Sequence, residues 1–498
     1  MNWDAWLPLS VVLSSLVPGI LIAMLREESH RLRTVYNLIG ATAKFVLVGT
    51  MLWGVSQGYV YETRLSLIPG IDFVLHADAL PLLFVTLSTV LWLLTTIYAI
   101  GYLEDAPHRS RFFVFFSLCV SATVGLALAG NLLTFVIFYE MLTLATYPLV
   151  VHRGTEAALR AGRTYLTYTL GGGALLLLAV AWLYALGGSL EFIEGGALNG
   201  ADALPRGALT AIFVMLITGL GVKAALVPLH GWLPLAMVAP APVSALLHAV
   251  AVVKAGAFGM VRVVYDVFGI ELSADLGLTG PLVVLASITI VYGSVRALSQ
   301  DELKRRLAFS TVSQVSYIAL GIALGSPLAT IGGIVHLVHQ GLMKITLFFC
   351  AGNLAETLGV HHVSEMRGAA RRMPWTMAAF TLGALGMIGV PPLAGFISKW
   401  YLGIGAFEAE QPWVIGVLVV SSLLNAAYFL PIVYLAWFQS PPDTWPDEHP
   451  SGRFETSLTL LAPPVITAAL AVVVGLLADM PFSPLAWVKL ITFREYGL

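Results

Sequence analysis

The sequence predicts an all-α polytopic membrane protein with about fourteen transmembrane helices, including two inverted five-helix repeats that each contain a broken helix. Three observations lead to this fold class. Hydrophobic residues make up 58% of the 498-residue chain and charged residues only 11%, whereas charged residues are roughly 25% of a typical soluble domain. Apolar runs of about 20 residues, the length that crosses a bilayer, recur along the chain. Two of the long runs are interrupted by prolines and contain a lysine.

Apolar runs long enough to cross a membrane occur fourteen times. They lie at 7–25, 35–55, 75–103, 112–130, 131–151, 162–186, 207–238, 240–263, 279–297, 307–325, 327–355, 374–404, 412–437 and 458–478. Gly130 and Asn131 form a predicted tight turn between the fourth run and the fifth. Because no basic segment and no clear small-residue cleavage site precede residue 30, the first run is predicted to be a retained helix and not a signal peptide.

The loops between the runs differ in their basic residues, and this difference predicts the orientation. One set of loops contains fifteen Lys or Arg residues and the other contains four. The first set comprises Arg26, Arg31, Arg33, Arg109, Arg111, Arg153, Arg160, Arg163, Lys304, Arg305, Arg306, Arg367, Arg371, Arg372 and Arg453, and the second comprises Arg64, Arg206, Lys489 and Arg494. Since Lys and Arg accumulate in cytoplasmic loops, the first set is predicted to face the cytoplasm. Both termini are then predicted to lie on the outer side of the cell's inner (cytoplasmic) membrane.

The predicted loops are too short to form a separate soluble domain. Residues 59–74 alternate around Pro69-Gly70 and predict a small outer hairpin. No loop contains a nucleotide-binding fingerprint, a catalytic triad order or a metal-ligand cluster. Cys119 and Cys350 lie inside apolar runs, which predicts buried free thiols. We therefore expect no cofactor, no metal site, no nucleic-acid partner and no soluble catalytic site.

Seven of the 26 basic residues remain inside the predicted spans. They are Lys44, Lys223, Lys254, Arg262, Arg296, Lys344 and Lys399. A lysine at mid-membrane costs roughly 2.5–3.5 kcal/mol to insert, so it is rarely there without a partner or a water path. The last four lysines are central or next to a helix break and predict an ion pathway. Arg262 and Arg296 lie near span ends, where a long side chain can reach the interface. Lys44 is either a pathway residue or a contact to another subunit.

The segment 219–259 contains two of these lysines on apolar runs that are joined by a proline-rich turn. Lys223 is mid-way along the first run, which Pro228 and Pro234 interrupt, and Lys254 follows His248 by six residues on the second predicted helix. Proline removes a backbone donor. Freed backbone groups at membrane depth are tolerated only inside protein or beside a water-filled cavity. A buried charge beside a broken helix therefore indicates an ion pathway.

One carboxylate belongs with these lysines. Glu140 lies in the middle of the fifth span, with apolar residues for a turn on either side. We expect it to form an ion pair with a lysine of another helix, most plausibly Lys223. An opposite charge nearby favours the charged forms of both groups, whereas burial favours the neutral forms. Moving a proton elsewhere in the membrane would then open or close the pair, which is the coupling that a pump needs.

Histidines provide groups that titrate near neutral pH. The intramembrane histidines are His230, His248, His336 and His339, and the loop histidines, which are predicted to be solvated, are His361 and His362. His336 and His339 are about one turn apart on one helix face, and Lys344 follows His339 by five residues. We expect the intramembrane histidines close to lysines to belong to the same pathway.

A second broken segment indicates internal symmetry. The run 374–404 is broken by Pro391-Pro392 and contains Lys399. It falls five spans after the run with Lys223, and an odd offset places successive units in opposite orientation, as inverted repeats require. The symmetry is imperfect, because Glu140 has no acidic counterpart in 307–325.

The repeats divide the chain into four predicted parts. These are 1–110, with the first three transmembrane helices; 111–265, the first five-helix repeat and proton-channel half; 279–437, the second, inverted repeat; and 438–498, a loop with the last transmembrane helix.

At several of these positions the sequence resembles a known family. Glu140 in its span, VKAALVPLHGWLPLAMVAPAPVSALLHA at 222–249, HQGLMK at 339–344 and GVPPLAGFISKW at 389–400 resemble the antiporter-like subunits of respiratory complex I and of Mrp-type cation/proton antiporters. In that family a glutamate of the fifth helix pairs with a lysine of the broken seventh helix, and further lysines and histidines continue a hydrated axis. The resemblance covers roughly residues 75–440. It implies proton-translocation roles for Glu140, Lys223, Lys254, His248, His339, Lys344 and Lys399, with His336 as an additional histidine and with breaks at Pro228, Pro391 and Pro392.

Within that family the chain most resembles the D-type component of the Mrp antiporters. The implied function is a proton-translocating membrane subunit of a multisubunit Mrp-type Na⁺(K⁺)/H⁺ antiporter, which is a secondary ion transporter and not an enzyme. The alternatives are an antiporter-like subunit of NADH-quinone oxidoreductase (complex I) or of a membrane-bound hydrogenase, each a redox-driven translocase, and then the membrane subunit of an inorganic-carbon uptake system. No long lateral-helix extension follows the fourteenth run, which argues against the most distal complex I subunit.

The single buried acid among many lysines and histidines favours protons as the ion that this chain moves. Sodium prefers carboxylate, hydroxyl and carbonyl oxygens. We therefore expect any sodium to pass elsewhere in a complex, and we expect the other subunits of that complex to be the partners of this chain.

Overall fold

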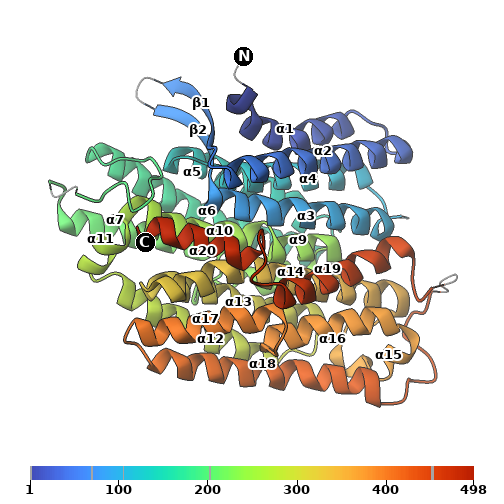
Figure 1. The fold of residues 1–498 in the computed structure, drawn as a ribbon. Coiled ribbons are helices and arrows are strands. Elements are labelled where there is room, and N and C mark those ends of the chain that lie inside the picture. The colour runs from blue at the N-terminus through green and yellow to red at the C-terminus, as the bar shows by residue number, and fades with distance from the viewer. Residues whose placement is uncertain (1–2, 69–70, 105, 201–202, 450–453, 498) are drawn as a thin grey trace.

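The computed structural model describes residues 3–68, 71–104, 106–200, 203–449 and 454–497. Arg453, one of the basic loop residues, and the predicted hairpin turn Pro69-Gly70 lie outside the described residues. Most helices run side by side in one bundle, with a β-hairpin at one end (Figure 1). We name the end with the hairpin the hairpin end. The opposite end, where the loops at 101–109, 151–155 and 359–373 lie, is named the basic end.

The predicted membrane-spanning architecture is confirmed. The long helices are α1 (Leu7–Ala23), α2 (His30–Ser56), α3 (Ala79–Tyr102), α4 (Arg109–Ala127), α5 (Leu132–Val150), α6 (Glu156–Ala185), α7 (Arg206–Lys223), α12 (Thr279–Leu298), α13 (Leu303–Ala323), α14 (Pro327–Leu358), α18 (Trp413–Phe438) and α19 (Leu458–Leu476). The shorter ones are α8 (Trp232–Leu235), α9 (Ala241–Ala249), α10 (Val252–Arg262), α11 (Ile270–Asp275), α15 (Ala369–Arg372), α16 (Pro374–Ile388), α17 (Ala394–Glu408) and α20 (Pro484–Glu495).

Twelve spans are long and apolar enough to cross a membrane, counted over the described residues. They include 241–268, which combines α9, α10 and the π-helical turn after them. Two more spans complete the predicted fourteen. One is α13, which begins with three basic residues, and the other is the broken pair α16 and α17, each half of which is 15 residues long. Gly130 and Asn131 separate α4 from α5 as predicted, and Asn131 caps α5 by accepting from the Thr134 N–H at 2.8 Å.

The predicted hairpin is confirmed by strands β1 (Tyr61–Ile68) and β2 (Ile71–Ala77), which pair antiparallel. Arg64 forms ion pairs with Glu62 at 2.9 Å, Asp72 at 3.1 Å and Glu191 at 3.3 Å. These pairs join the hairpin to the loop after α6. The hairpin is therefore a fixed part of the bundle's surface at its end.

Burial is unequal among the helices. The apolar windows of α14 and of 241–268 are completely buried, whereas only 33% of the window of α18 and 39% of that of α2 are buried. Large apolar side chains are exposed on these outer helices, among them Ile39, Phe45 and Leu423, as expected for surfaces that face lipid. The core therefore surrounds α14, α9 and α10, and these three helices contain most of the predicted pathway residues.

The two predicted helix breaks are present. Helix α7 ends at Lys223, and a turn with short α8 follows before α9 begins. Helix α16 ends at Ile388 and α17 begins at Ala394, with Pro391 and Pro392 between them. Lys223 is therefore the last residue of a helix and not mid-way along one. A cation at that position interacts favourably with the unpaired carbonyls of the helix C-terminus.

The prediction of one continuous helix over 240–263 is wrong. Helix α9 ends at Ala249 and α10 begins at Val252, so His248 and Lys254 lie on different helices. The break contains no proline or glycine, and the sequence therefore has no local signal for it. Its cause is tertiary packing: a Cβ at Gly256 would lie 2.4 Å from the Ala224 nitrogen, so α10 is pressed against the break that follows α7.

A further helix, α20, was not predicted. Its 12 residues pack against α3 and α14, and the Trp487 indole donates to the Ala79 carbonyl at 2.7 Å. Since 12 residues are too few to cross a bilayer, α20 covers the bundle near the hairpin end without spanning it.

Candidate functional site

Glu140 lies on α5 against a close packing point of α6. A Cβ at Gly173 would meet the Glu140 Oε1 at 1.6 Å, so only glycine leaves room for the carboxylate. The Oε1 is buried and has no hydrogen-bond partner among the described residues. The residue as a whole is half-buried. A carboxylate held this way at mid-bundle depends on a nearby cation or on water for its solvation.

Lys223 is fully buried next to α5, but it does not touch the carboxylate directly. Its ammonium donates to the Tyr139 carbonyl and lies 3.4 Å from the centroid of the Tyr139 ring. The charges of Lys223 and Glu140 interact electrostatically. No ion pair within 4 Å joins them in the described part of the chain, so the predicted contact pair is not closed here. The sequence missed this arrangement because the competing acceptor is a backbone carbonyl.

Lys254 on α10 is completely buried, and its ammonium has no hydrogen-bond partner in the described residues. Its charge interacts with those of His336, His339 and Lys344 on α14. His248, across the break between α9 and α10, stacks on Phe348 with ring centroids 4.6 Å apart. Lys254 is therefore the point where the first repeat meets α14.

On α14 the structure brings together the predicted residues His336, His339 and Lys344, all of them completely buried. His336 forms two hydrogen bonds, to Ser398 at 2.8 Å and to Gln314 at 3.2 Å. Both ring nitrogens of His339 are buried without a partner in the described residues. Buried polar atoms of this kind are normally satisfied by water. The region around His339 and Lys254 is thus suited to hold water inside the bundle.

Lys344 and Lys399 are connected by a continuous chain of hydrogen bonds. The Lys344 ammonium donates to Ser310 at 2.7 Å, and Ser310 is 2.8 Å from the Tyr428 hydroxyl. Tyr428 donates to Asn425 at 2.5 Å. Asn425 and Lys399 both donate to the Met387 carbonyl, at 3.0 and 3.1 Å. Ser310 and Tyr428 were missed by the sequence analysis, although isolated polar residues in apolar helices were available as a signal.

The line of residues begins and ends at half-buried groups. Glu140 on α5 and Lys399 on α17 are partly exposed, while Lys223, Lys254 and Lys344 between them are fully buried. Lys399 donates to the Ile388 carbonyl at 2.8 Å and to Ser422 at 2.9 Å. The helix break before α17 frees these carbonyls, which explains why a lysine is placed beside it.

Arg262 does not reach the interface, contrary to the prediction. It is 3% exposed and forms an ion pair with Asp266 at 2.7 Å. Asp266, four residues on, was missed, although an Arg and an Asp at this spacing face each other on a helix. Arg296 lies in the last turn of α12 and is exposed, in agreement with its prediction.

Lys44 is an internal residue, so the predicted alternative of a contact to another subunit is wrong. Its side chain is completely buried. The ammonium donates to Ser15 at 2.7 Å and lies 4.5 Å from the Trp92 ring centroid. It lies among α1, α2 and α3, and both of these contacts are to residues outside the line described above.

The remaining histidines fall outside the line. His230 packs against Tyr292 of α12 with ring centroids 5.0 Å apart. His361 and His362 are exposed, as predicted.

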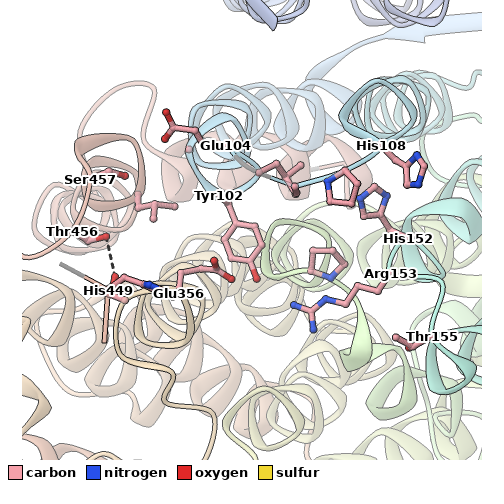
Figure 2. Close-up of a pocket in the computed structure, with 17 residues that line it drawn as sticks. Tyr102, Glu104, His108, His152, Arg153, Thr155, Glu356, His449, Thr456 and Ser457 are labelled. Atoms are coloured by element: carbon pink, nitrogen blue, oxygen red, sulfur yellow. Dashed lines mark hydrogen bonds between the residues drawn. The ribbon is translucent and has the colours of Figure 1, made fainter. Parts of the chain in front are cut away.

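A cavity of about 960 Å³ opens at the basic end, between α3, the loop after α5 and the end of α14 (Figure 2). Its polar lining residues include Tyr102, Glu104, His108, His152, Arg153, Glu356 and His449. Tyr102 and Glu356 interact across it. Burial, followed by the charge of Arg111, lowers the pKa of His152 to about 4, so this histidine is neutral near pH 7. Tyr98, one turn before Tyr102, donates to the Phe349 carbonyl at 3.0 Å and separates the cavity from the His248–Phe348 stack.

Comparison with known proteins supports the family that the geometry suggests. Residues 129–425 match the family model "NADH:quinone oxidoreductase/Mrp antiporter, TM", and residues 69–113 match "NADH-Ubiquinone oxidoreductase (complex I), chain 5 N-terminus". The chain is 36% identical over 425 residues to the N-type component of the NADH-quinone oxidoreductase of Desulforudis audaxviator, with 83% of each chain covered. It is 26% identical over 483 residues to the D-type component of the Na(+)/H(+) antiporter of Alkalihalophilus pseudofirmus, with 95% of each covered.

A solved structure has the same fold. A chain of the Mrp complex from Dietzia sp. matches with a TM-score of 0.87 at 24% identity, covering 100% of this chain and 98% of that one. The family match covers the broken helices α7 and α16–α17 and every residue of the line from Glu140 to Lys399. The chain therefore belongs to the NADH:quinone oxidoreductase/Mrp antiporter transmembrane family.

Proposed function

We propose that this chain is a proton-translocating, antiporter-like subunit of a multisubunit membrane complex. The observation that supports this most directly is the line of ionisable groups from Glu140 through Lys223, Lys254 and Lys344 to Lys399. Buried charges are costly in a membrane and mark ion paths. In the second repeat, hydrogen bonds connect the groups without a gap; in the first, buried polar atoms without protein partners require water between them.

Protons would move along this line by changing the charge of one lysine after another. A proton added to Lys254 disfavours the charged form of the neighbouring histidines and of Lys344, because like charges repel at short range. Lys344 can then pass a proton through Ser310 and Tyr428, whose hydroxyls both donate and accept. Opening or closing the gap between Lys223 and Glu140 changes the charge that Lys254 experiences, and this couples the two halves.

The cavity at the basic end would provide access from the cytoplasm, given the predicted orientation. It contains Glu104, Glu356 and His449, which can collect protons at the surface. Beyond it lie Tyr98, Phe349 and the His248–Phe348 stack. Movement of these aromatic rings would admit water between the cavity and His248, and His248 lies close enough to Lys344 for their charges to interact.

Within the family we propose an Mrp-type Na⁺(K⁺)/H⁺ antiporter as the complex, because the D-type component of a Na(+)/H(+) antiporter matches over 95% of both chains. The alternative is a proton-pumping subunit of NADH-quinone oxidoreductase, which the higher identity of 36% to the N-type component of such an enzyme favours. In both, this chain moves protons and its partners are other membrane subunits. The half-buried Glu140 and Lys399 are the positions where such partners would complete the line.

The experiment that tests the function is proton transport in everted membrane vesicles containing the intact complex, followed with a pH-sensitive dye. A pH gradient that collapses on adding Na⁺ or K⁺ supports the antiporter, and one that forms on adding NADH supports the redox-driven complex. Affinity purification of the tagged chain identifies the accompanying subunits. If neither cations nor an electron donor move protons through the wild-type complex, the proposal is wrong.

Gly173→Ala is expected to reduce transport to a small fraction of the wild-type rate. The added Cβ would lie 1.6 Å from the Glu140 Oε1, so the carboxylate must leave its position. Gly171→Ala is the matched control, since a Cβ there meets nothing within 4 Å on the same helix. Both variants are measured in vesicles at equal complex content. Equal rates for the two would contradict the placement of Glu140.

Lys399→Cys is expected to react with a membrane-impermeant thiol reagent added from the outer side. Lys399 is half-buried beside the break before α17, toward the hairpin end that is predicted to face outward. The buried Cys119 and Cys350 are first replaced by Ala. Lys223→Cys, at a fully buried position, is expected to react more slowly from that side. Reaction of Lys399→Cys from the cytoplasmic side alone would overturn the predicted orientation.

A further inference from the structure

A second cluster of ionisable side chains lies at the hairpin end, outside the line from Glu140 to Lys399. Arg262, at the end of α10, donates to the Asp266 carboxylate at 2.7 Å, and the two side chains are 3% and 2% exposed. Asp266 belongs to a π-helical turn, Val263–Phe268, that continues α10. Such turns are rare and occur frequently at functional sites.

Two carboxyl groups meet in this cluster. The Asp266 and Glu495 side chains lie within hydrogen-bonding reach of each other. A carboxylate has no donor, so two carboxyl groups form a hydrogen bond only when one of them holds a proton. Burial, followed by the charge of Asp266, raises the pKa of Glu495. The pair is therefore suited to hold a single proton that both residues share.

Arg262 provides the positive charge that a deprotonated pair needs. Its Nε and Nη2 are buried and have no acceptor among the residues that the structure describes. The guanidinium remains charged at all relevant pH values. Two unused donors beside a carboxyl pair lower the cost of its second negative charge, and so they make release of the shared proton possible.

Neighbouring elements hold the pair in place. The Glu495 Oε2 accepts from the Gly195 N–H at 3.2 Å. The Tyr265 hydroxyl is 2.6 Å from Thr330 on α14, and Thr330 is 2.9 Å from the Tyr496 hydroxyl. These contacts fix the end of α20, the π-helical turn and α14 relative to one another. The short C-terminal helix (red in Figure 1) thus places one half of the pair.

Exposure increases stepwise from the pair toward the outside. Asp78 interacts electrostatically with Arg262 and is 14% exposed. His76 lies 3.4 Å from Asp78 and 3.4 Å from Glu62, and the exposures of these two side chains, His76 and Glu62, are 28% and 40%. Burial alone would lower the pKa of His76, but Asp78 and Glu62 raise it. A histidine between two carboxylates can accept a proton from one side and release it on the other.

Toward the inside, α10 leads directly to the pathway. Lys254 and Arg262 are eight residues apart on one helix face, or about 12 Å at 1.5 Å per residue. Phe258 lies between them on the same face, and its ring is 5.4 Å from the Arg262 guanidinium. A short apolar barrier of this kind would allow protons to pass only when water enters it.

We propose that the Asp266–Glu495 carboxyl pair is a proton-release site that connects Lys254 to the outer surface. This inference rests on the proposed function. A proton leaves the Lys254 ammonium, crosses the Phe258 barrier through water and joins the pair. The pair then gives its shared proton to Asp78 and His76, and from there to water beside Glu62. Arg262 stays charged throughout, so the pair alternates between one proton and none.

The pH dependence of this site involves every charged or titratable group around it. These are Arg262 on α10, Tyr265 on the π-helical turn, Asp78 at the start of α3, Tyr496 on α20 and, beyond Tyr496, Glu408 at the end of α17. When the outer solution is acidified, the pair keeps its proton and release slows. Transport by the wild-type complex is therefore expected to decrease as outer pH falls.

Glu495→Gln in the intact complex tests the proposal, because glutamine keeps the size and the oxygen that accepts from Gly195 but cannot share a proton. We expect transport to decrease by about tenfold or more, and its dependence on outer pH to disappear. Glu495→Asp should restore both in part. Glu408→Gln is the matched control, since this exposed glutamate also accepts a backbone N–H, from Leu328 at 3.1 Å. An infrared band of a buried protonated carboxyl should be present in wild type and absent in Glu495→Gln.

The outcomes separate this inference from the proposed function. If Glu495→Gln transports protons like wild type while Glu140→Gln does not, the release site is wrong and the pathway stands. If neither variant changes transport, the proposed function fails as well. Unchanged proton transport with a loss of sodium binding, measured with radioactive Na⁺, would make the pair a cation site and overturn its assignment to protons.

Discussion

Glu140→Gln is expected to abolish proton transport, with a decrease on the order of a hundredfold or more, while the protein still inserts and assembles. Glutamine fits the space beside Gly173 and keeps a polar group at Oε1, so packing on α6 is preserved. It removes the negative charge that interacts with Lys223. Without this charge, no step in the first repeat can change the charge balance around Lys254. Transport in everted vesicles, normalised to the amount of complex, is the measurement.

Glu271→Gln is the matched control for this prediction, because Glu271 is an exposed glutamate on α11, away from the line. It should transport at the wild-type rate. Full transport by Glu140→Gln at normal assembly would show that the mid-membrane carboxylate has no part in moving protons. Loss of assembly in Glu140→Gln alone would show that the carboxylate is structural.

The sequence predicted the fold well because its strongest signals are long-range and additive. Apolar runs of membrane length give the fourteen spans, and prolines mark the breaks before α8 and α17. The break between α9 and α10 could not be predicted, because Val250 and Ala251 are ordinary helix residues. It results from the packing of Gly256 against the end of α7, which exists only in the folded bundle.

The candidate site was predicted in its residues but not in its connections. Lysines, histidines and one glutamate in apolar spans are visible in the sequence because burying them is costly. The partner of Lys223 is the Tyr139 carbonyl, and one partner of Lys399 is the Met387 carbonyl. Backbone acceptors are present at every position, so nothing in the sequence selects one.

The hairpin-end cluster was missed for a different reason. Asp266 and Glu495 are 229 positions apart, and an acidic residue near a span end or in a terminal segment usually faces water. Only the docking of α20, through Trp487, places Glu495 against the π-helical turn. A short helix after the last span gives no hydropathy signal for such a position.

Lys223→Ala is expected to reduce transport as severely as Glu140→Gln, because each change leaves the other charge buried without its counterpart. The ammonium also holds the Tyr139 carbonyl at the point where α7 ends. The double variant should lose little more than either single variant, since both remove the same electrostatic step and their effects are not additive. The rates of the four proteins, measured in one vesicle assay, complete the cycle.

Lys223→Arg separates the two roles that a lysine can have here. Arginine keeps a positive charge beside Glu140 but does not lose its proton in proteins. If Lys223 must release its proton during transport, Lys223→Arg should assemble better than Lys223→Ala and still be inactive. Transport by Lys223→Arg near the wild-type rate would mean that only the charge is needed. If the losses in the Glu140→Gln and Lys223→Ala variants simply multiply in the double variant, the two groups act independently and the coupling proposed between them is wrong.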